Sequence, residues 1–237
     1  MNIGILEVGQ NNAKMDKRRP HYADMFITLL EIENTALTFT PIAVRDGVFP
    51  TCVSAYDGYL VTGSAYGVYD DMPWLMPLIS LIRAAYEQQI PQMGICFGHQ
   101  VIAHALGGSV EKSEKGWGVG IRSADITAPT NWMKGAGETM RLIYFHQDQV
   151  VRLPDTAHRI AGNPFCPNAG FAIGTIIFSL QGHPEFPVDY AKELLGILKP
   201  KVGKDLTCDA LLTLNRPTDN ALVADWIRRF FLQHAVS

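Results

Sequence analysis

The sequence QMGICFGHQVIAHALG, residues Gln92–Gly107, contains the junction around which this chain is arranged. Residues 90–95 form a short apolar run, which predicts a buried strand. After Cys96, apolar residues recur at helical spacing, which predicts a helix. Cys96 therefore lies at an abrupt change from strand to helix, with Gly94 and Gly98 two residues to either side.

A junction of this kind is typical of a nucleophile elbow. The sharp turn requires small neighbours and presents its central side chain at the carboxyl edge of a sheet. The positive end of the helix dipole also favours a thiolate over a thiol at Cys96. The alternative is a buried, inert cysteine, which is common in proteins. The two flanking glycines and the change from strand to helix favour the nucleophile.

The N-terminal half of the chain alternates strand and helix patterns around this junction. Strands are expected at residues 3–8, 36–42, 59–62 and 90–95, and helices at 22–31, 70–85 and 97–106. Alternation of this kind predicts an α/β fold with a central, mostly parallel sheet and helices on both faces.

The C-terminal half begins with short segments rich in β-forming residues, separated by glycine and proline. These segments are residues 109–112, 118–126, 141–145, 158–161, 172–173 and 175–180. They predict antiparallel strands that flank or extend the parallel sheet. Helices are expected at 188–198, 203–214 and 220–234, the last with an apolar stripe that should pack on the body of the protein. Because no linker or repeat interrupts the chain, we expect one domain over residues 1–237.

Composition limits the classes of function. The net charge of −3 gives no electrostatic reason to expect a nucleic acid or an acidic membrane surface as partner. No apolar run approaches the ~20 residues that span a bilayer, and the N-terminus lacks a signal-peptide pattern. The four cysteines are widely spaced with no CxxC pair, which argues against a zinc site or a disulfide framework. We therefore expect a soluble protein of the cytoplasm.

A thiolate nucleophile needs a base and a group that orients the base. His183 follows the expected strand 175–180, so it lies at the same sheet edge as Cys96 if the two strands are parallel. Glu185 lies two residues further on, where extended backbone puts both side chains on one face and the carboxylate can fix the imidazole tautomer. A surface turn and half of a metal site are the alternatives. No third ligand is evident at a recognisable spacing, and His99 alone is a weak candidate.

The nucleophile also needs donors for an oxyanion. The backbone N–H of Phe97, directly after Cys96, is one expected donor. A second could come from the turn Gly63-Ser64-Ala65, which a parallel sheet would bring beside Cys96 and where glycine permits close approach. An ordinary loop is the alternative for this turn.

Taken together, these segments resemble the class I glutamine amidotransferase family. The residues that carry the resemblance are Gly94-Ile-Cys-Phe-Gly-His-Gln100 and Gln181-Gly-His-Pro-Glu185, with Tyr59–Ser64, Lys115–Val119 and Phe145–Asp148 in the family's order. They cover most of residues 1–190, and five segments in order are far more specific than a lone GxCxG motif.

The resemblance implies a flavodoxin-like α/β fold and hydrolysis of a γ-glutamyl amide through a thioester, with no cofactor or metal. Cys96 would attack the γ-carbonyl, His183 would act as base and then acid, and Glu185 would orient His183. The N–H groups of Ser64 and Phe97 would hold the oxyanion. The expected substrate-binding residues are Gly63, Gln100, Gly118 and His146.

Two departures from the family pattern leave the leaving group open. The turn at Gly63 has the sequence Gly-Ser-Ala-Tyr where synthetase-linked members usually have a Gly-Gly-Pro type, and we expect no second catalytic domain in this chain to receive ammonia. The chain could be the glutaminase subunit of a separate synthetase. It could instead act alone on γ-glutamyl peptides, since it looks closest to the stand-alone members. A catalytically idle binding or regulatory module is the third possibility, although Cys96, His183 and Glu185 are all present.

Overall fold

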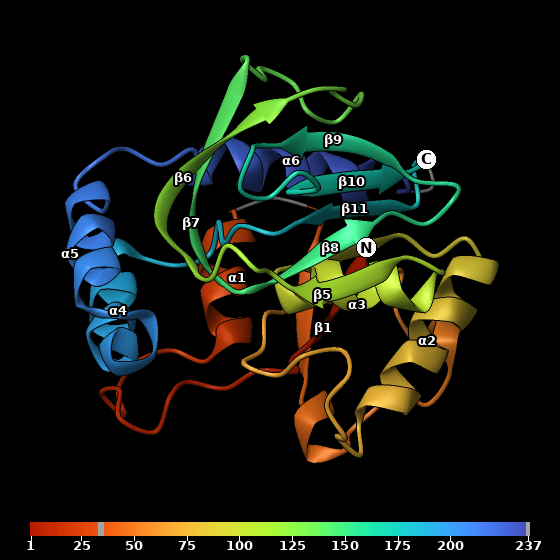
Figure 1. Ribbon diagram of the computed structural model, residues 1–237. Coiled ribbons are helices and arrows are strands. Elements are labelled where there is room, and N and C mark those ends of the chain that lie inside the picture. Colours follow the sequence, from red (N-terminus) through yellow and green to blue (C-terminus); the bar gives the residue numbers. More distant parts are fainter. Residues whose placement is uncertain (33–35, 236–237) are drawn as a thin grey trace.

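Five parallel strands form the part of the sheet that carries Cys96 (Figure 1). The computed structural model describes residues 1–32 and 36–235. In spatial order, the parallel strands are β2 (Thr38–Ile42), β1 (Asn2–Leu6), β3 (Gly58–Val61), β4 (Gln92–Ile95) and β11 (Ile177–Leu180). The mostly parallel sheet expected from the sequence is confirmed.

Antiparallel strands extend this sheet beyond β11, as predicted. Residues 175–180 were expected among the antiparallel strands, but they form β11, which is parallel to β4 and antiparallel only to β10, because the chain re-enters the sheet beside β4. They are β10 (Gly170–Ile173), β9 (His158–Gly162), β6 (Gly118–Ile126) and β7 (Thr139–His146). A separate pair consists of β5 (Ser109–Lys112) and β8 (Asp148–Arg152). Strand β8 was not expected from the sequence, because its two buried residues are too few to show a period and its pairing with β5 is long-range.

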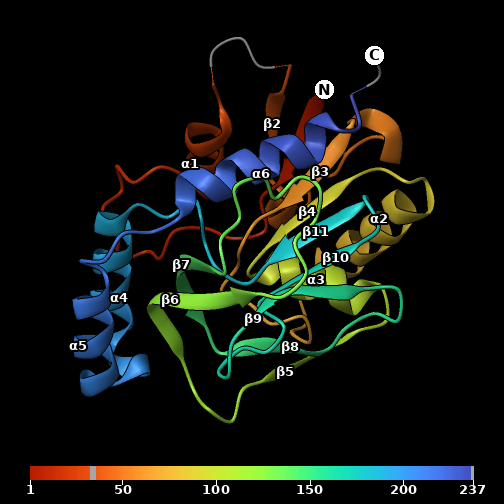
Figure 2. The same ribbon diagram turned by 90° about the horizontal axis from the view of Figure 1, so that it is seen from above.

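The helices cover both faces and one end of the sheet (Figure 2). One face carries α1 (Tyr22–Leu30) and α6 (Asn220–Leu232), and the other carries α2 (Leu75–Glu87) and α3 (Phe97–Ala105). At the end, α4 (Val188–Val202) and α5 (Lys204–Thr213) lie beside β6 and β7. Two 3-10 turns, η1 (Val44–Asp46) and η2 (Val53–Ala55), lie between β2 and β3.

Alternate residues of the central strands bury their side chains on opposite faces. Leu60, Met93 and Phe178 pack in the core below α1 and α6, whereas Tyr59 and Val61 pack with α2 and α3. The apolar stripe of α6 is buried on the body of the protein, as predicted. Among the described residues, no helix is both long and apolar enough to cross a membrane.

Strand register brings the candidate residues to one edge. Val61 of β3 pairs with Gly94 of β4, and Ile95 of β4 pairs with Leu180 of β11. Because these three strands are parallel, the segments that follow them emerge together at the carboxyl edge of the sheet. Gly63, Cys96 and His183 lie in those segments.

Candidate active site

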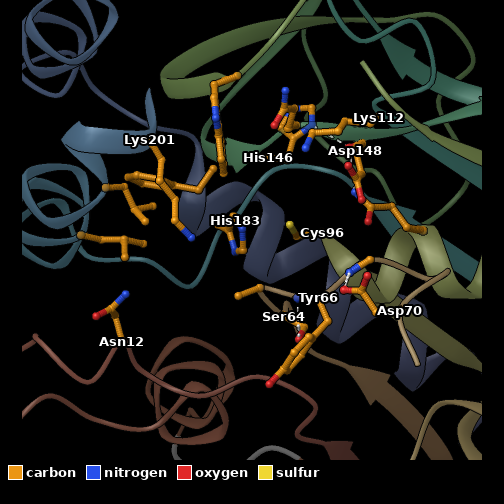
Figure 3. Close-up of a pocket in the computed structure, with 18 of the residues that line it drawn as sticks. Asn12, Ser64, Tyr66, Asp70, Cys96, Lys112, His146, Asp148, His183 and Lys201 are labelled. Atoms are coloured by element: carbon orange, nitrogen blue, oxygen red, sulfur yellow. Dashed lines mark hydrogen bonds between the residues drawn. The ribbon is translucent and has the colours of Figure 1, made fainter. Parts of the chain in front are cut away.

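Cys96 occupies a strained turn between β4 and α3. Its backbone has φ 54° and ψ −104°, and its N–H donates to the carbonyl oxygen of Leu180 at 2.9 Å. A residue other than glycine rarely adopts positive φ, and such a conformation costs about 1–3 kcal/mol. The surrounding strands hold the turn in place, and the sulfur points into a cavity (Figure 3).

The two flanking glycines leave no room for side chains. A Cβ on Gly98 would lie 2.1 Å from the carbonyl oxygen of Val61, and one on Gly94 would lie 2.6 Å from the carbonyl carbon of Gly98. These distances are far below van der Waals contact with rigid backbone. The elbow therefore needs glycine on both sides of Cys96, for the steric reason inferred from the sequence.

His183 faces Cys96 from the segment that follows β11. Its backbone N–H donates to the carbonyl oxygen of Ile143 at 2.7 Å, which anchors this segment on β7. Its Nδ1 lies 2.7 Å from Oε1 of Glu185, and both side chains are buried. Because a carboxylate can only accept, Nδ1 carries the hydrogen, and Nε2 remains for the sulfur.

The surroundings of His183 favour its protonated form. Burial alone lowers the pKa of the imidazole, but the charges of Glu185 and Cys96, with hydrogen bonds to both, outweigh it and raise the pKa to about 10. An imidazolium beside a cysteine sulfur stabilises the thiolate, which is the nucleophilic form.

Gly63 lets the turn after β3 approach these two side chains. A Cβ on Gly63 would lie 2.9 Å from Cε1 of His183 and 3.6 Å from Cβ of Cys96. Residues from three distant segments, which the sequence analysis joined only by inference, therefore meet at one point.

The residues expected to supply the oxyanion donors belong to the segments that meet there. The N–H of Phe97 belongs to the first turn of α3, where helix N–H groups have no intrahelical partner. The N–H of Gly98 donates to the carbonyl oxygen of Thr62 at 3.2 Å and ties the end of β3 to α3. Ser64 follows this tie and lines the cavity.

A cavity of about 690 Å³ opens beside Cys96 and His183 (Figure 3). Its volume lies within the range of about 300–1,000 Å³ that is usual for small-molecule sites. One end, here named the Asp148 end, consists of Tyr69, Asp70, Gln100, Lys112, His146 and Asp148. Another side, here named the α4 wall, consists of Leu194, Leu198 and Lys201.

Hydrogen bonds hold the Asp148 end together. Nε2 of Gln100 donates to the backbone carbonyl of Asp148 at 2.8 Å, and Nδ1 of His146 lies 3.0 Å from the same oxygen. The hydroxyl of Tyr69 donates to Oδ2 of Asp148 at 2.7 Å. Burial lowers the pKa of His146 to about 4, so this ring is neutral near pH 7. Two of the expected substrate-binding residues, Gln100 and His146, thus line the cavity.

Gly118 does not line the cavity. It pairs with His146 across β6 and β7, and a Cβ on it would lie 2.8 Å from Nε2 of His146 and 2.7 Å from Cε1 of Phe165. Its place is behind the imidazole, where the absence of a side chain makes room for that ring. Phe97 likewise buries its side chain in the core and offers the site only its backbone.

Several lining residues had no role in the sequence analysis. Phe186 stacks on the His183 ring, with centroids 4.0 Å apart and ring planes 7° apart. Its position directly after Glu185 was the signal available for it. Asp148 ends the segment Phe145–Asp148 that resembles the family, but the sequence indicated no role for it. The α4 wall had no local signal, because it reaches the site only through the packing of α4 against the end of the sheet.

Within the described part of the chain, no group of three or more His, Cys, Asp or Glu side chains is arranged to hold a metal ion.

The chain belongs to the class-I glutamine amidotransferase family, whose model matches residues 35–194. It is 34% identical over 211 residues to a candidate glutamine amidotransferase of Saccharomyces cerevisiae, covering 83% of this chain and 82% of the yeast protein. It is also 33% identical over 160 residues to γ-glutamyl peptidase 3 of Arabidopsis thaliana, covering 64% of this chain and 63% of the peptidase.

Solved structures show the same fold. A glutamine amidotransferase from Thermotoga maritima superimposes with a TM-score of 0.77 over 100% of this chain and 98% of that one, at 20% identity. The family resemblance and the flavodoxin-like α/β architecture expected from the sequence are confirmed.

Proposed function

We propose that this protein is a cysteine-dependent hydrolase of γ-glutamyl amides, with Cys96 as nucleophile, His183 as base and acid, and Glu185 as the orienting carboxylate. One observation carries the proposal. Cys96 is held in a strained elbow beside His183, whose Nδ1 is 2.7 Å from Glu185, at the wall of a cavity. Membership in the amidotransferase family supports the same chemistry.

In the acylation step, Sγ of Cys96 attacks the γ-carbonyl carbon of the substrate. The carbonyl π electrons move to oxygen, which becomes an oxyanion near the N–H groups of Phe97 and Ser64. When the tetrahedral intermediate collapses, the C–N bond breaks and Nε2 of His183 gives its proton to the leaving nitrogen. The products are a free amine and a γ-glutamyl thioester on Cys96.

In the deacylation step, water attacks the thioester carbon. His183, now neutral, accepts a proton from the water as the new C–O bond forms. The C–S bond then breaks, the sulfur leaves as a thiolate and glutamate is released. The imidazolium and thiolate of the resting site are thereby restored.

We place the glutamyl group at the Asp148 end of the cavity. Its α-ammonium carries a positive charge, and Asp70 and Asp148 offer carboxylates there. Its α-carboxylate carries a negative charge, and Lys112 lies at the same end. Gln100 and His146 position this end through the backbone carbonyl of Asp148.

Two versions of this function differ in the leaving group of the substrate. In one, the chain hydrolyses glutamine and passes ammonia to a separate synthetase, and a relative named as a glutamine-hydrolysing GMP synthase subunit from Methanospirillum hungatei supports it, at 38% identity over 96 residues. In the other, the chain cleaves γ-glutamyl peptides by itself. The peptidase relatives and a cavity larger than glutamine requires support this second version.

We also infer that residues 1–237 act as one domain in the cytoplasm. One sheet joins strands from the N-terminal and C-terminal halves of the chain. The cysteines at 52, 96, 166 and 208 are free, which suits a reducing compartment.

Trapping with an electrophilic glutamine analogue, a γ-diazoketone, tests the enzyme against the idle module. Peptide mass spectrometry should find the adduct on Cys96, although Cys96 is buried and Cys52 and Cys208 are exposed. Those two cysteines serve as internal controls for non-specific alkylation. His183→Ala should slow labelling. A folded protein labelled at Cys52 and Cys208 but not at Cys96 would favour the idle module.

A further inference from the structure

The α4 wall lies on the His183 side of the cavity. Phe186 stacks on the His183 ring and also contacts Tyr190 of α4, with ring centroids 4.7 Å apart. The Asp148 end is built from other elements, namely α3, β5, the junction of β7 and β8, and the segment between β3 and α2. In Figure 3, Lys201 and His183 lie together on one side of Cys96, and His146 and Asp148 lie on another.

This arrangement gives the substrate a direction, given the proposed function. His183 donates its proton to the leaving nitrogen, so the leaving group must extend from Cys96 on the His183 side. With the glutamyl group at the Asp148 end, the part of the substrate beyond the scissile bond meets the α4 wall.

The chemistry of the α4 wall is specific. Leu194, Leu198 and Lys201 follow one another at helical spacing, so they share one face of α4. The Lys201 side chain turns into the cavity toward His183 (Figure 3). It forms no ion pair with any residue in the described ranges 1–32 and 36–235. Two apolar side chains followed by an ammonium group complement an amine that carries an apolar part and a carboxylate.

We propose that the α4 wall is the leaving-group subsite, and that the Lys201 ammonium binds a carboxylate carried by the leaving amine. The inference rests on the proposed function and extends it, because ammonia has neither an apolar part nor a charge to meet this wall. Lys201 is then a specificity-determining residue that selects γ-glutamyl amino acids or peptides over glutamine.

The test uses two substrates that differ only in the leaving-group carboxylate, γ-glutamyl-leucine and γ-glutamyl-leucinamide. Three variants are compared with the wild type. Lys201→Met removes the charge and keeps the length, Lys201→Arg keeps the charge, and Lys199→Met removes a neighbouring charge on α4 that does not line the cavity. Thermal unfolding midpoints confirm that each variant is folded.

The wild type should prefer the carboxylate substrate, and Lys201→Met should lower its kcat/KM about fivefold, as expected for one partly exposed ion pair. The loss should appear in KM rather than kcat, because the contact is the same before and during bond breaking. The leucinamide substrate should be unaffected, Lys201→Arg should restore the preference, and Lys199→Met should behave as wild type.

Failure of this inference and failure of the proposed function give different results. If Lys201→Met changes both substrates equally, or neither, the assignment of Lys201 is wrong while the hydrolase stands. If Lys199→Met has the same effect as Lys201→Met, the cause is the general field of α4 and the assignment is also wrong. If neither substrate is cleaved in a Cys96-dependent reaction, the proposed function is wrong, and the assignment of the subsite is then wrong as well.

Discussion

The imidazole of His183 lies face to face on the ring of Phe186, with centroids 4.0 Å apart and planes 7° apart. Phe186 is in turn packed against Tyr22 and Tyr190, with centroids 5.8 Å and 4.7 Å away. A cation above an aromatic face is stabilised by the negative potential of that face. The stack therefore fixes the plane of the proposed base and favours its protonated form.

Phe186→Leu should lower kcat/KM about fivefold to tenfold, because a buried stack of this kind contributes about 1 kcal/mol or more. It should also move the alkaline limb of the pH profile to lower pH, since the imidazolium loses a stabilising contact. Phe186→Tyr keeps the ring and should retain the limb. A reduced rate with an unchanged pH profile would mean that Phe186 only fills space.

The alkaline limb itself is expected near pH 10. The pKa of His183 is raised to about 10 from its ordinary value of 6.5, so the general acid keeps its proton across neutral pH and loses it only at higher pH. Activity measured as kcat/KM should therefore fall as pH rises through about 10. A limb near pH 6.5 in the wild type would show that Glu185 and Cys96 do not hold the proton.

Glu185→Gln should move this limb toward pH 6.5. Burial would still disfavour the imidazolium of His183, whereas the negative charge of Glu185 that favours it would be gone. Its loss of rate at pH 7 should be smaller than that of His183→Ala, which removes the proton carrier and should cost on the order of 10³-fold or more. Equal losses in the two variants would mean that Glu185 does more than orient His183.

The elbow makes a prediction about stability. Cys96→Ala and Cys96→Gly should both abolish turnover, but only glycine adopts φ 54° without strain. In chemical denaturation, the free energy of unfolding of Cys96→Gly should exceed that of Cys96→Ala by about 1 kcal/mol. The strain that glycine relieves in the folded protein is larger than the conformational entropy that it adds to the unfolded chain. If Cys96→Ala proves the more stable variant, the turn relaxes without cost.

His99 should make the fold acid-sensitive. It is fully buried, its Nδ1 is 2.7 Å from the Ser179 hydroxyl, and burial lowers its pKa to about 3 from 6.5. Between those values the unfolded chain binds a proton that the folded protein does not, so stability falls as pH falls. Denaturant titrations at pH 7.5 and pH 5 measure how much the free energy of unfolding falls between these two values. This fall should be about 2 kcal/mol smaller for His99→Gln than for the wild type. Equal losses would place the acid sensitivity elsewhere, for example at the buried His146.

The parts of the site that the sequence predicted depend on which residues a short segment of backbone can accommodate and on the order of strands and helices. The turn at Cys96 needs glycine at 94 and 98 for steric reasons, and the alternation of strand and helix segments predicted parallel strands that end at one edge. Parallel order alone then brings the segments after β3, β4 and β11 together, which is why Gly63 and His183 could be placed near Cys96.

Gly118 shows where the motif was insufficient. The resemblance implied a substrate-binding role, whereas the residue lies behind His146 and makes room for its ring. Sequence order cannot distinguish a glycine that faces a ligand from one that faces a neighbouring side chain, because only the pairing of β6 with β7 fixes what it meets.

The sequence alone determined the α/β class, the elbow and the candidate residues Cys96, His183 and Glu185, since each produces a recognisable pattern within a few neighbouring positions. Only the tertiary structure decided that Phe186 lies flat on His183 and that Leu194, Leu198 and Lys201 line the cavity. Those contacts join a loop and a helix to elements far away in the chain, and they result from packing, for which no local pattern is required.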